Sequence, residues 1–283
     1  TSILHTPNVT ICSPFRDAAD TLAEYINRIA DLDYPFENRR YVFVEGDSMD
    51  NTWKELQLWT EDDDRYTLVK CDTGAPHYPS IVNIERFATL AQVFNAALDA
   101  VDLEWSDYVL FLPSDIRYAP DLLKRLLAAE RYIISPFVWI TIDGVYHFYD
   151  TWAFQRMGHS FSGFTPTMSD YGTKPIAMDT VGGVTLIKAD VLRLGVRYTP
   201  DEVDRGLCGM AREKGFTVWA DPTTHVYHPP FAPEQPTPEG LARYIGQDAQ
   251  TVRKAIAEKY GFDCGEQYAQ DFVAFVENLT HAR

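Results

Sequence analysis

DYVLFLPSDIRYAPDLLKRLL, residues 107–127, joins an apolar run to a loop with one acid and then to a helical pattern. Five apolar or aromatic residues precede the loop that holds Asp115, and leucines recur at helical spacing after Pro120. A buried strand that passes through a loop into a covering helix is the repeating unit of parallel α/β sheets. We therefore predict a strand, a loop that presents one carboxylate, and a helix.

The same order of strand and helix occurs three times before this segment. The expected pairs are residues 8–15 with 17–32, 41–44 with 52–59, and 66–72 with 84–101. Four successive units of this kind predict an α/β fold with a mostly parallel sheet flanked by helices. In such sheets ligands bind beyond the carboxyl ends of the strands.

The alternation becomes less regular after about residue 131. An aromatic-rich segment predicts further strands, and the residues from about 203 to 220 predict a helix and another strand. Two or three helical stretches then follow up to the last residue, with no linker before them. We predict one α/β domain, residues 1–236, and a helical C-terminal extension, residues 237–283, packed on the same domain.

Composition narrows the function classes. The 283 residues are 46% hydrophobic, enough for a substantial core, and a net charge of −16 argues against nucleic acid as the main partner. No apolar run reaches membrane-spanning length and the first residues lack a leader pattern, so we expect neither a transmembrane segment nor a leader. The four cysteines form no CxxC pair, which predicts a reducing, cytoplasmic setting.

Polar residues gather where the predicted strands end. The segment EGDSMDNT, residues 45–52, can present carboxylates and small groups to a base and ribose, but a solvated turn with a helix cap explains it equally well. Asp115 is placed as a ligand for a hard cation would be, and a helix cap or turn residue is the alternative. At this point both interpretations stay open.

Six segments taken in order resemble GT-A-fold nucleotide-sugar glycosyltransferases of the family 2-like type. They are VTICSPFRD, YVFVEGDSMDNT, DYVLFLPSDI, VGGVTLI, DEVDRGLCGMAREKG and ADPTTHVYH, spread over residues 9–228. The resemblance implies a GT-A catalytic domain, hexosyl transfer from a UDP- or GDP-linked donor to a hydroxyl acceptor, and Mn²⁺ or Mg²⁺ as cofactor. The segment YDTWA, residues 149–153, is also similar to a segment of fungal capsule and mannan transferases.

The resemblance also assigns residues to the donor and the metal. Asp115 matches the second acid of a D-x-D motif, with Pro113 in place of the first, and His228 matches the histidine that closes the metal shell, with His225 as the near alternative. We expect this degenerate motif to make metal binding depend on the nucleotide. The expected donor-binding residues are Pro14, Arg16, Glu45, Asp47, Ser48, Ser114, Gly182 and Gly183.

Two later segments hold the residues that we expect to catalyse the transfer and to bind the acceptor. Asp204 matches the aspartate of the x-E-D element and is the expected base of an inverting enzyme, with Glu202 second; in a retaining enzyme these acids would instead hold acceptor hydroxyls. For the acceptor we expect Asp150, Trp152 and Arg156, because aromatic faces and charged groups recognise sugars. A core strand with alternating aromatics is the other interpretation of that segment.

The predicted function is therefore that of a metal-dependent glycosyltransferase. A nucleotidyltransferase usually has a glycine-rich loop after its first strand, which CSPFRDAAD, residues 12–20, lacks. A non-catalytic carbohydrate-binding protein has no need for Asp115, Asp204 and His228 together. A glycosyltransferase acting on modified bases in DNA is the third alternative, and the net charge of −16 argues against it.

Overall fold

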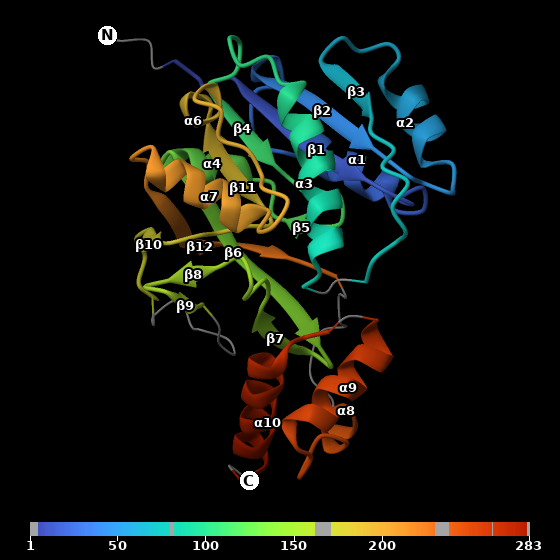
Figure 1. Cartoon of the computed structure of the whole chain (residues 1–283), viewed down its shortest axis with the longest axis vertical. Helices are drawn as coiled ribbons and strands as arrows, with labels where there is room; N and C mark the ends of the chain where they lie inside the picture. The colour runs from blue at the N-terminus through green and yellow to red at the C-terminus, as the bar shows by residue number, and fades with distance from the viewer. Residues whose placement is uncertain (1–4, 80–81, 162–170, 230–237, 262, 282–283) are drawn as a thin grey trace.

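The computed structural model describes residues 5–79, 82–161, 171–229, 238–261 and 263–281, and it has one large twisted sheet with helices packed against it (Figure 1). The strands are β1 (Val9–Phe15), β2 (Arg39–Glu45), β3 (Tyr66–Lys70), β4 (Tyr108–Phe111), β5 (Arg117–Tyr118), β6 (Ile133–Ile142), β7 (Val145–Phe148), β8 (Gln155–Arg156), β9 (His159–Ser160), β10 (Ile176–Met178), β11 (Thr185–Lys188) and β12 (Val218–Tyr227). The helices are α1 (Leu22–Ala30), η1 (Phe36–Asn38), α2 (Thr52–Thr60), α3 (Ile84–Asp99), α4 (Leu122–Ala128), α6 (Ala189–Arg193), α7 (Asp204–Glu213), α8 (Pro238–Ala242), α9 (Ala249–Tyr260) and α10 (Glu266–His281).

The sheet confirms the predicted α/β class and shows where its direction changes. Its strand order is β10-β12-β6-β11-β4-β1-β2-β3, with β5 beside β12 and β7 beside β6. The first four predicted strands pair in parallel, β1 with both β2 and β4, and β2 with β3. Beyond β4 the sheet is mixed, because β6 turns directly into the hairpin strand β7 and β11 runs antiparallel to both β4 and β6.

Burial follows the periodicities in the sequence. The central strand β1 is almost entirely buried, and α1 packs its apolar stripe, Leu22, Tyr25, Ile26 and Ile29, against the sheet. Among the described residues, no helix is long and apolar enough to cross a bilayer.

The C-terminal helices α8, α9 and α10 pack beside the β6–β7 hairpin (Figure 1). A second, smaller core joins Ile140, Ile142 and Val145 of the hairpin to Ile256 of α9 and Phe272 of α10. The predicted boundary between residues 236 and 237 lies outside the described residues, so the division into two parts stays a prediction.

The ends of β2 and β3 approach each other more closely than any side chain would allow. A Cβ atom on Gly46 would lie 2.0 Å from the carbonyl oxygen of Cys71, which is backbone and has no rotamer to change. The loop after β2, which enters the predicted site, therefore depends on a glycine at this position.

We expect Gly46→Ala to lower the free energy of unfolding by about 1–3 kcal/mol, the usual cost of overpacking a buried position. Urea unfolding measures the change. Gly209→Ala is the matched control, because Gly209 lies within α7 with no atom within 4 Å of its Cβ position. Alanine there should stabilise the helix by up to about 1 kcal/mol. Equal stability of the Gly46→Ala variant and the unchanged protein would contradict this account.

Candidate active site

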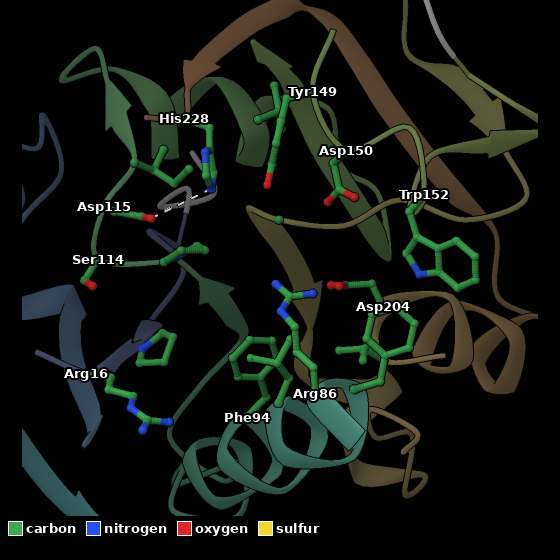
Figure 2. A pocket seen from close by; sticks show the side chains of 18 of the residues that line it. Arg16, Arg86, Phe94, Ser114, Asp115, Tyr149, Asp150, Trp152, Asp204 and His228 are labelled. Atoms are coloured by element: carbon green, nitrogen blue, oxygen red, sulfur yellow. Dashed lines mark ion pairs between the residues drawn. The ribbon is translucent and has the colours of Figure 1, made fainter. Parts of the chain in front are cut away.

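A cavity of about 840 Å³ opens at the carboxyl ends of β1, β2 and β4, where the parallel sheet was expected to bind its ligand (Figure 2). Its volume falls within the range of pockets that bind small molecules and cofactors. Apolar side chains that include Phe94 and Phe111 form part of its lining, and polar groups enter from several loops. The predicted strand ends therefore converge on one site.

The loops after β1 and β2 form one wall of the cavity and are tied together by their own carboxylates. Asp17 accepts a hydrogen bond of 2.6 Å from the backbone N–H of Met49. Asp47 accepts hydrogen bonds from the Thr73 hydroxyl at 2.6 Å and the Gly74 N–H at 2.9 Å. Burial raises the pKa of Asp47, but these hydrogen bonds outweigh burial and lower it overall. The wall is therefore preformed without a ligand.

Five of the eight predicted donor-binding residues line the cavity, namely Pro14, Arg16, Asp47, Ser114 and Gly183. Arg16 donates hydrogen bonds to the carbonyl oxygens of Ala75 and Pro76, at 3.0 and 3.3 Å. Its guanidinium therefore holds the loop after β3 against the loop after β1.

Glu45 and Ser48 were also predicted for the donor wall, and the structure places neither in the cavity lining. Glu45 is fully buried, forms an ion pair with Lys70, and accepts a hydrogen bond of 3.0 Å from the Ser48 N–H. The Ser48 hydroxyl accepts a hydrogen bond of 2.9 Å from the Asp17 N–H. Both residues hold the loop in shape, so they act on the cavity only through the residues they position.

Three further predicted residues also lie outside the cavity lining. Glu202 forms an ion pair with Arg205 at 3.3 Å, and Arg156 is exposed on the small hairpin of β8 and β9. Glu202 and Gly182 directly precede lining residues, Val203 and Gly183, so position along the chain alone did not separate them.

Asp115 and His228 meet at the cavity, as the metal prediction required. Their nearest side-chain atoms, Oδ2 of Asp115 and Nε2 of His228, lie 3.8 Å apart (Figure 2). The pairing of β5 with β12 brings them together, because Asp115 shortly precedes Arg117 and His228 directly follows Tyr227, the partner of Arg117. The His228 ring also stacks on Tyr149, with 4.0 Å between ring centroids.

The hydrogen bonding of His228 suits a metal ligand. Its Nδ1 lies 2.6 Å from the carbonyl oxygen of Pro229, so Nδ1 carries the proton and donates it there. The Nε2 lone pair then faces Asp115 and the cavity, the arrangement found in metal-binding histidines. His225 differs, because its Nδ1 accepts a hydrogen bond of 2.7 Å from the indole of Trp139.

The opposite side of the cavity carries a pair of carboxylates, Asp150 and Asp204. Figure 2 shows both on the same side, with the guanidinium of Arg86 pointing toward them from α3. Burial, and then the charge of Asp150, raise the pKa of Asp204 to about 8. Burial also raises the pKa of Asp150, while Ala153, His228 and Arg86 act in the opposite direction. One of the two carboxyls therefore holds a proton at neutral pH.

Strained backbone aims these carboxylates into the cavity. Asp150 has φ 65° and Val203, directly before Asp204, has φ 47°, a conformation that β-branched residues rarely adopt. Gly182 leaves room for Asp204, because a Cβ there would lie 2.9 Å from Cγ of Asp204 and 2.6 Å from Cβ of Ala153. The Gly-Gly turn thus sets the position of both acids rather than contacting the ligand through Gly182.

Trp152 lines the cavity, but other side chains lie against its ring. Its ring centroid lies 5.4 Å from that of Phe87, and the Arg205 guanidinium lies 4.2 Å from the ring. These contacts leave less of the ring for stacking on a sugar than the sequence suggested. The acceptor roles predicted for Trp152 and Asp150 stay predictions, and both residues line the cavity.

Sequence reasoning did not find Arg86 or the part of the C-terminal extension that reaches the cavity. Arg86 lies in the first turn of α3, where one basic residue resembles any helix surface. No motif marks it, and its role becomes visible only when α3 is placed against the loop that follows β7.

Comparison with known proteins identifies the fold and the family. The model of glycosyltransferase family 25, N-terminal domain, matches residues 6–153, more than half of the chain. Human procollagen galactosyltransferase 2 is 30% identical over 149 residues, which cover 48% of this chain and 23% of the relative. A glycosyltransferase 25 family member from Anopheles gambiae is 24% identical over 150 residues, which cover 50% of this chain and 25% of the relative. The chain therefore spans about a quarter of the length of these curated relatives.

Two solved structures share the fold. The mannosyltransferase PcManGT from Pyrobaculum calidifontis, in complex with GDP-Man and Mn²⁺, aligns with a TM-score of 0.54 at 14% identity, over 99% of this chain and 76% of the other. GalNAc-T7 with UDP, GalNAc and Mn²⁺ aligns with a TM-score of 0.53 at 11% identity, over 97% and 55%. The chain thus has the GT-A fold of nucleotide-sugar glycosyltransferases, as the sequence resemblance predicted.

The raised pKa of Asp204 predicts a pH dependence of stability. In the unfolded chain an aspartate has a pKa of about 3.9, so between about pH 4 and pH 8 the folded chain binds the extra proton. The contribution of this group to the free energy of unfolding is full below about pH 4 and is lost as the pH rises through the folded pKa, about 8.

We expect urea unfolding to give a fall in stability between about pH 4 and pH 8 that Asp204→Asn reduces. Asp121→Asn, at an exposed position paired with Arg125, is the control and should keep the fall of the unchanged protein. The same fall in all three proteins would show that Asp204 is ionised throughout this range.

Proposed function

Because this chain belongs to glycosyltransferase family 25, we propose that it transfers a hexose from a nucleotide-sugar donor to a hydroxyl acceptor. One observation carries the proposal further than the family does. The cavity has Asp115 and His228 on one side and the pair of Asp150 and Asp204 on the other, with an apolar lining between them. This arrangement suits a donor diphosphate on one side and an activated acceptor hydroxyl on the other.

For the donor, we assign the nucleoside to the wall formed by Pro14, Arg16 and Asp47. Ser114 lies next to Asp115 and Gly183 lies against Asp150, so these two residues would contact the diphosphate and the sugar. UDP and GDP are the first nucleotides to test, because the two structural neighbours contain UDP and GDP-Man. Galactose is the first sugar to test, since the human relative is named a galactosyltransferase.

The Asp115–His228 pair fits a divalent metal such as Mn²⁺ or Mg²⁺. When bound, the metal would neutralise the negative charge that builds up on the leaving diphosphate. Among the described residues, no group of three or more His, Cys, Asp and Glu side chains is arranged to hold a metal. The chain therefore supplies two ligands here, and the donor phosphates and water would supply the others. This supports the expectation that metal binding depends on the nucleotide.

For the acceptor, we propose that Asp204 removes the hydroxyl proton in an inverting transfer. A base with a pKa near the working pH is partly ionised and accepts a proton readily. Asp150 would hold the acceptor hydroxyls, and Arg86 would keep the two carboxylates close together by offsetting their charge. The six aspartates among the cavity-lining residues argue against a nucleic-acid acceptor.

A cytoplasmic location belongs to the same proposal. The four cysteines are free thiols in the structure, which agrees with a reducing setting.

Asp115→Ala and His228→Ala should each abolish the thermal stabilisation that Mn²⁺ adds to a bound nucleotide, because each removes one of two protein ligands. The measurement compares melting temperatures with UDP or GDP, with and without Mn²⁺. Asp121→Ala, an exposed aspartate beyond the same strand end, is the control and should respond like the unchanged protein. Mn²⁺ alone should give little shift, and tight binding of Mn²⁺ without a nucleotide would contradict the two-ligand site.

The rate of transfer should rise with pH and level off above about pH 8, where Asp204 is ionised. Asp150→Asn should move this rise to lower pH, because the charge of Asp150 raises the pKa of Asp204. Asp204→Asn should lower kcat by about 10²–10⁴-fold, the usual contribution of a general base. Full turnover of Asp204→Asn, or a product with the retained anomeric configuration, would remove the base role.

A further inference from the structure

The C-terminal extension contributes to the cavity although it lies far from the strand ends in sequence. Arg253 of α9, the segment Asp263–Gly265 and Tyr268 of α10 line the same cavity as Asp115 and Asp204. Residues 6–153 match the family model, so this part of the wall has no assigned role. Its position makes it a candidate for binding the second substrate.

The extension is fixed in place by a buried acid in the β6–β7 turn. Asp143 has a side chain 6% exposed and forms ion pairs with Lys259 and Arg243. It accepts hydrogen bonds from the hydroxyls of Tyr260 at 2.6 Å and Tyr244 at 2.7 Å. Burial raises the pKa of Asp143, but the hydrogen bonds from Lys259, Tyr260 and Tyr244 lower it overall. These contacts tie α8 and α9 to the hairpin that leads to Asp150.

The extension enters the cavity directly beside the predicted acceptor segment. Tyr268 packs against His147 of β7, with 3.8 Å between ring centroids, and His147 lies shortly before Tyr149 and Asp150 in the chain. Tyr268 is almost fully buried and belongs to the second core. The wall from the extension is therefore continuous with the carboxylate side of the cavity.

Arg253 and Asp263 form the polar part of this wall. The guanidinium donates two hydrogen bonds of 2.5 Å to the two carboxylate oxygens, and the Gly265 N–H donates a third, of 3.0 Å, to Oδ1. The two side chains are 40% and 34% exposed, so the pair is ordered yet accessible. Among the described residues, no acceptor lies on Nη1 of Arg253, and Oδ2 of Asp263 has a free lone pair.

We propose that the Arg253–Asp263 pair is the acceptor subsite and that it binds a neutral sugar. The proposal rests on the function proposed above. Nη1 of Arg253 would donate to one hydroxyl, and Oδ2 of Asp263 would accept from the neighbouring hydroxyl. The pair itself is neutral, and six aspartates against three arginines line the whole cavity, so an anionic acceptor would be repelled. A neutral polyol matches both the charge and the hydrogen-bonding groups.

Binding of methyl glycosides to the whole chain tests the subsite without knowledge of the natural acceptor. The probes are methyl β-galactoside, methyl β-glucoside and methyl α-mannoside, measured by saturation-transfer NMR in the presence of UDP or GDP and Mg²⁺. At least one probe should bind the unchanged protein. Arg253→Gln and Asp263→Asn should each weaken that binding at least tenfold, and Lys254→Gln, an exposed neighbour on the same helix, should not.

Nucleotide affinity separates this proposal from the proposed function. Both variants should bind UDP or GDP with Mg²⁺ as the unchanged protein does, which also shows that they fold. If the unchanged protein binds neither UDP nor GDP, the donor assignment is wrong, whatever the outcome for the subsite. Three results would each overturn the subsite. The two variants could bind the glycosides as the unchanged protein does, or the unchanged protein could bind no methyl glycoside. The third result is a preference for methyl glucuronide over methyl glucoside.

Discussion

The candidate active site depends on the short antiparallel pairing between β5 and the end of β12. Tyr118 pairs with Val226 and Arg117 with Tyr227, and these two partners fix the register of the segments on either side. Asp115 lies just before one strand and His228 just after the other, so the register alone sets their separation. A slip of one residue would turn successive side chains to the opposite face and separate the pair. This pairing lies in the mixed half of the sheet, where β12 also pairs with β6 and β10.

The carboxylate side of the cavity is held by a different means. Asp150 and Val203 have positive φ, and Gly182, which has no side chain, leaves the space that Asp204 and Ala153 occupy. Packing around these residues must offset the strain, and the buried Ala153 and Phe154 donate backbone hydrogen bonds of 3.1 Å to the carbonyl oxygen of Asp150. Strain concentrated beside two acids with raised pKa values is typical of a functional site rather than of a structural turn.

The sequence predicted the first four strands and their helices because these depend on local pattern. Motif order led to Asp115 and His228, whose metal role stays a prediction. Thr52 begins α2 and Ile84 begins α3 where the patterns placed them. Glu45 was assigned to the donor wall because a strand-end acid faces either a ligand or a basic neighbour, and only the register of β2 with β3 places Lys70 opposite it. Arg86 and Arg253 were not found, because their position depends on how whole helices pack, which no local pattern encodes.

The cavity is lined by residues from Pro14 to Tyr268, so almost the whole chain takes part in it. During synthesis the parallel strands can pair once β4 has emerged, since β1, β2, β3 and β4 all end by Phe111. The wall formed by α9 and α10 arrives only later, after β6 and β7 have formed the surface that receives it. A nascent chain can therefore acquire its nucleotide wall well before it has a complete place for the second substrate. Transfer would begin only with the docking of the last helices.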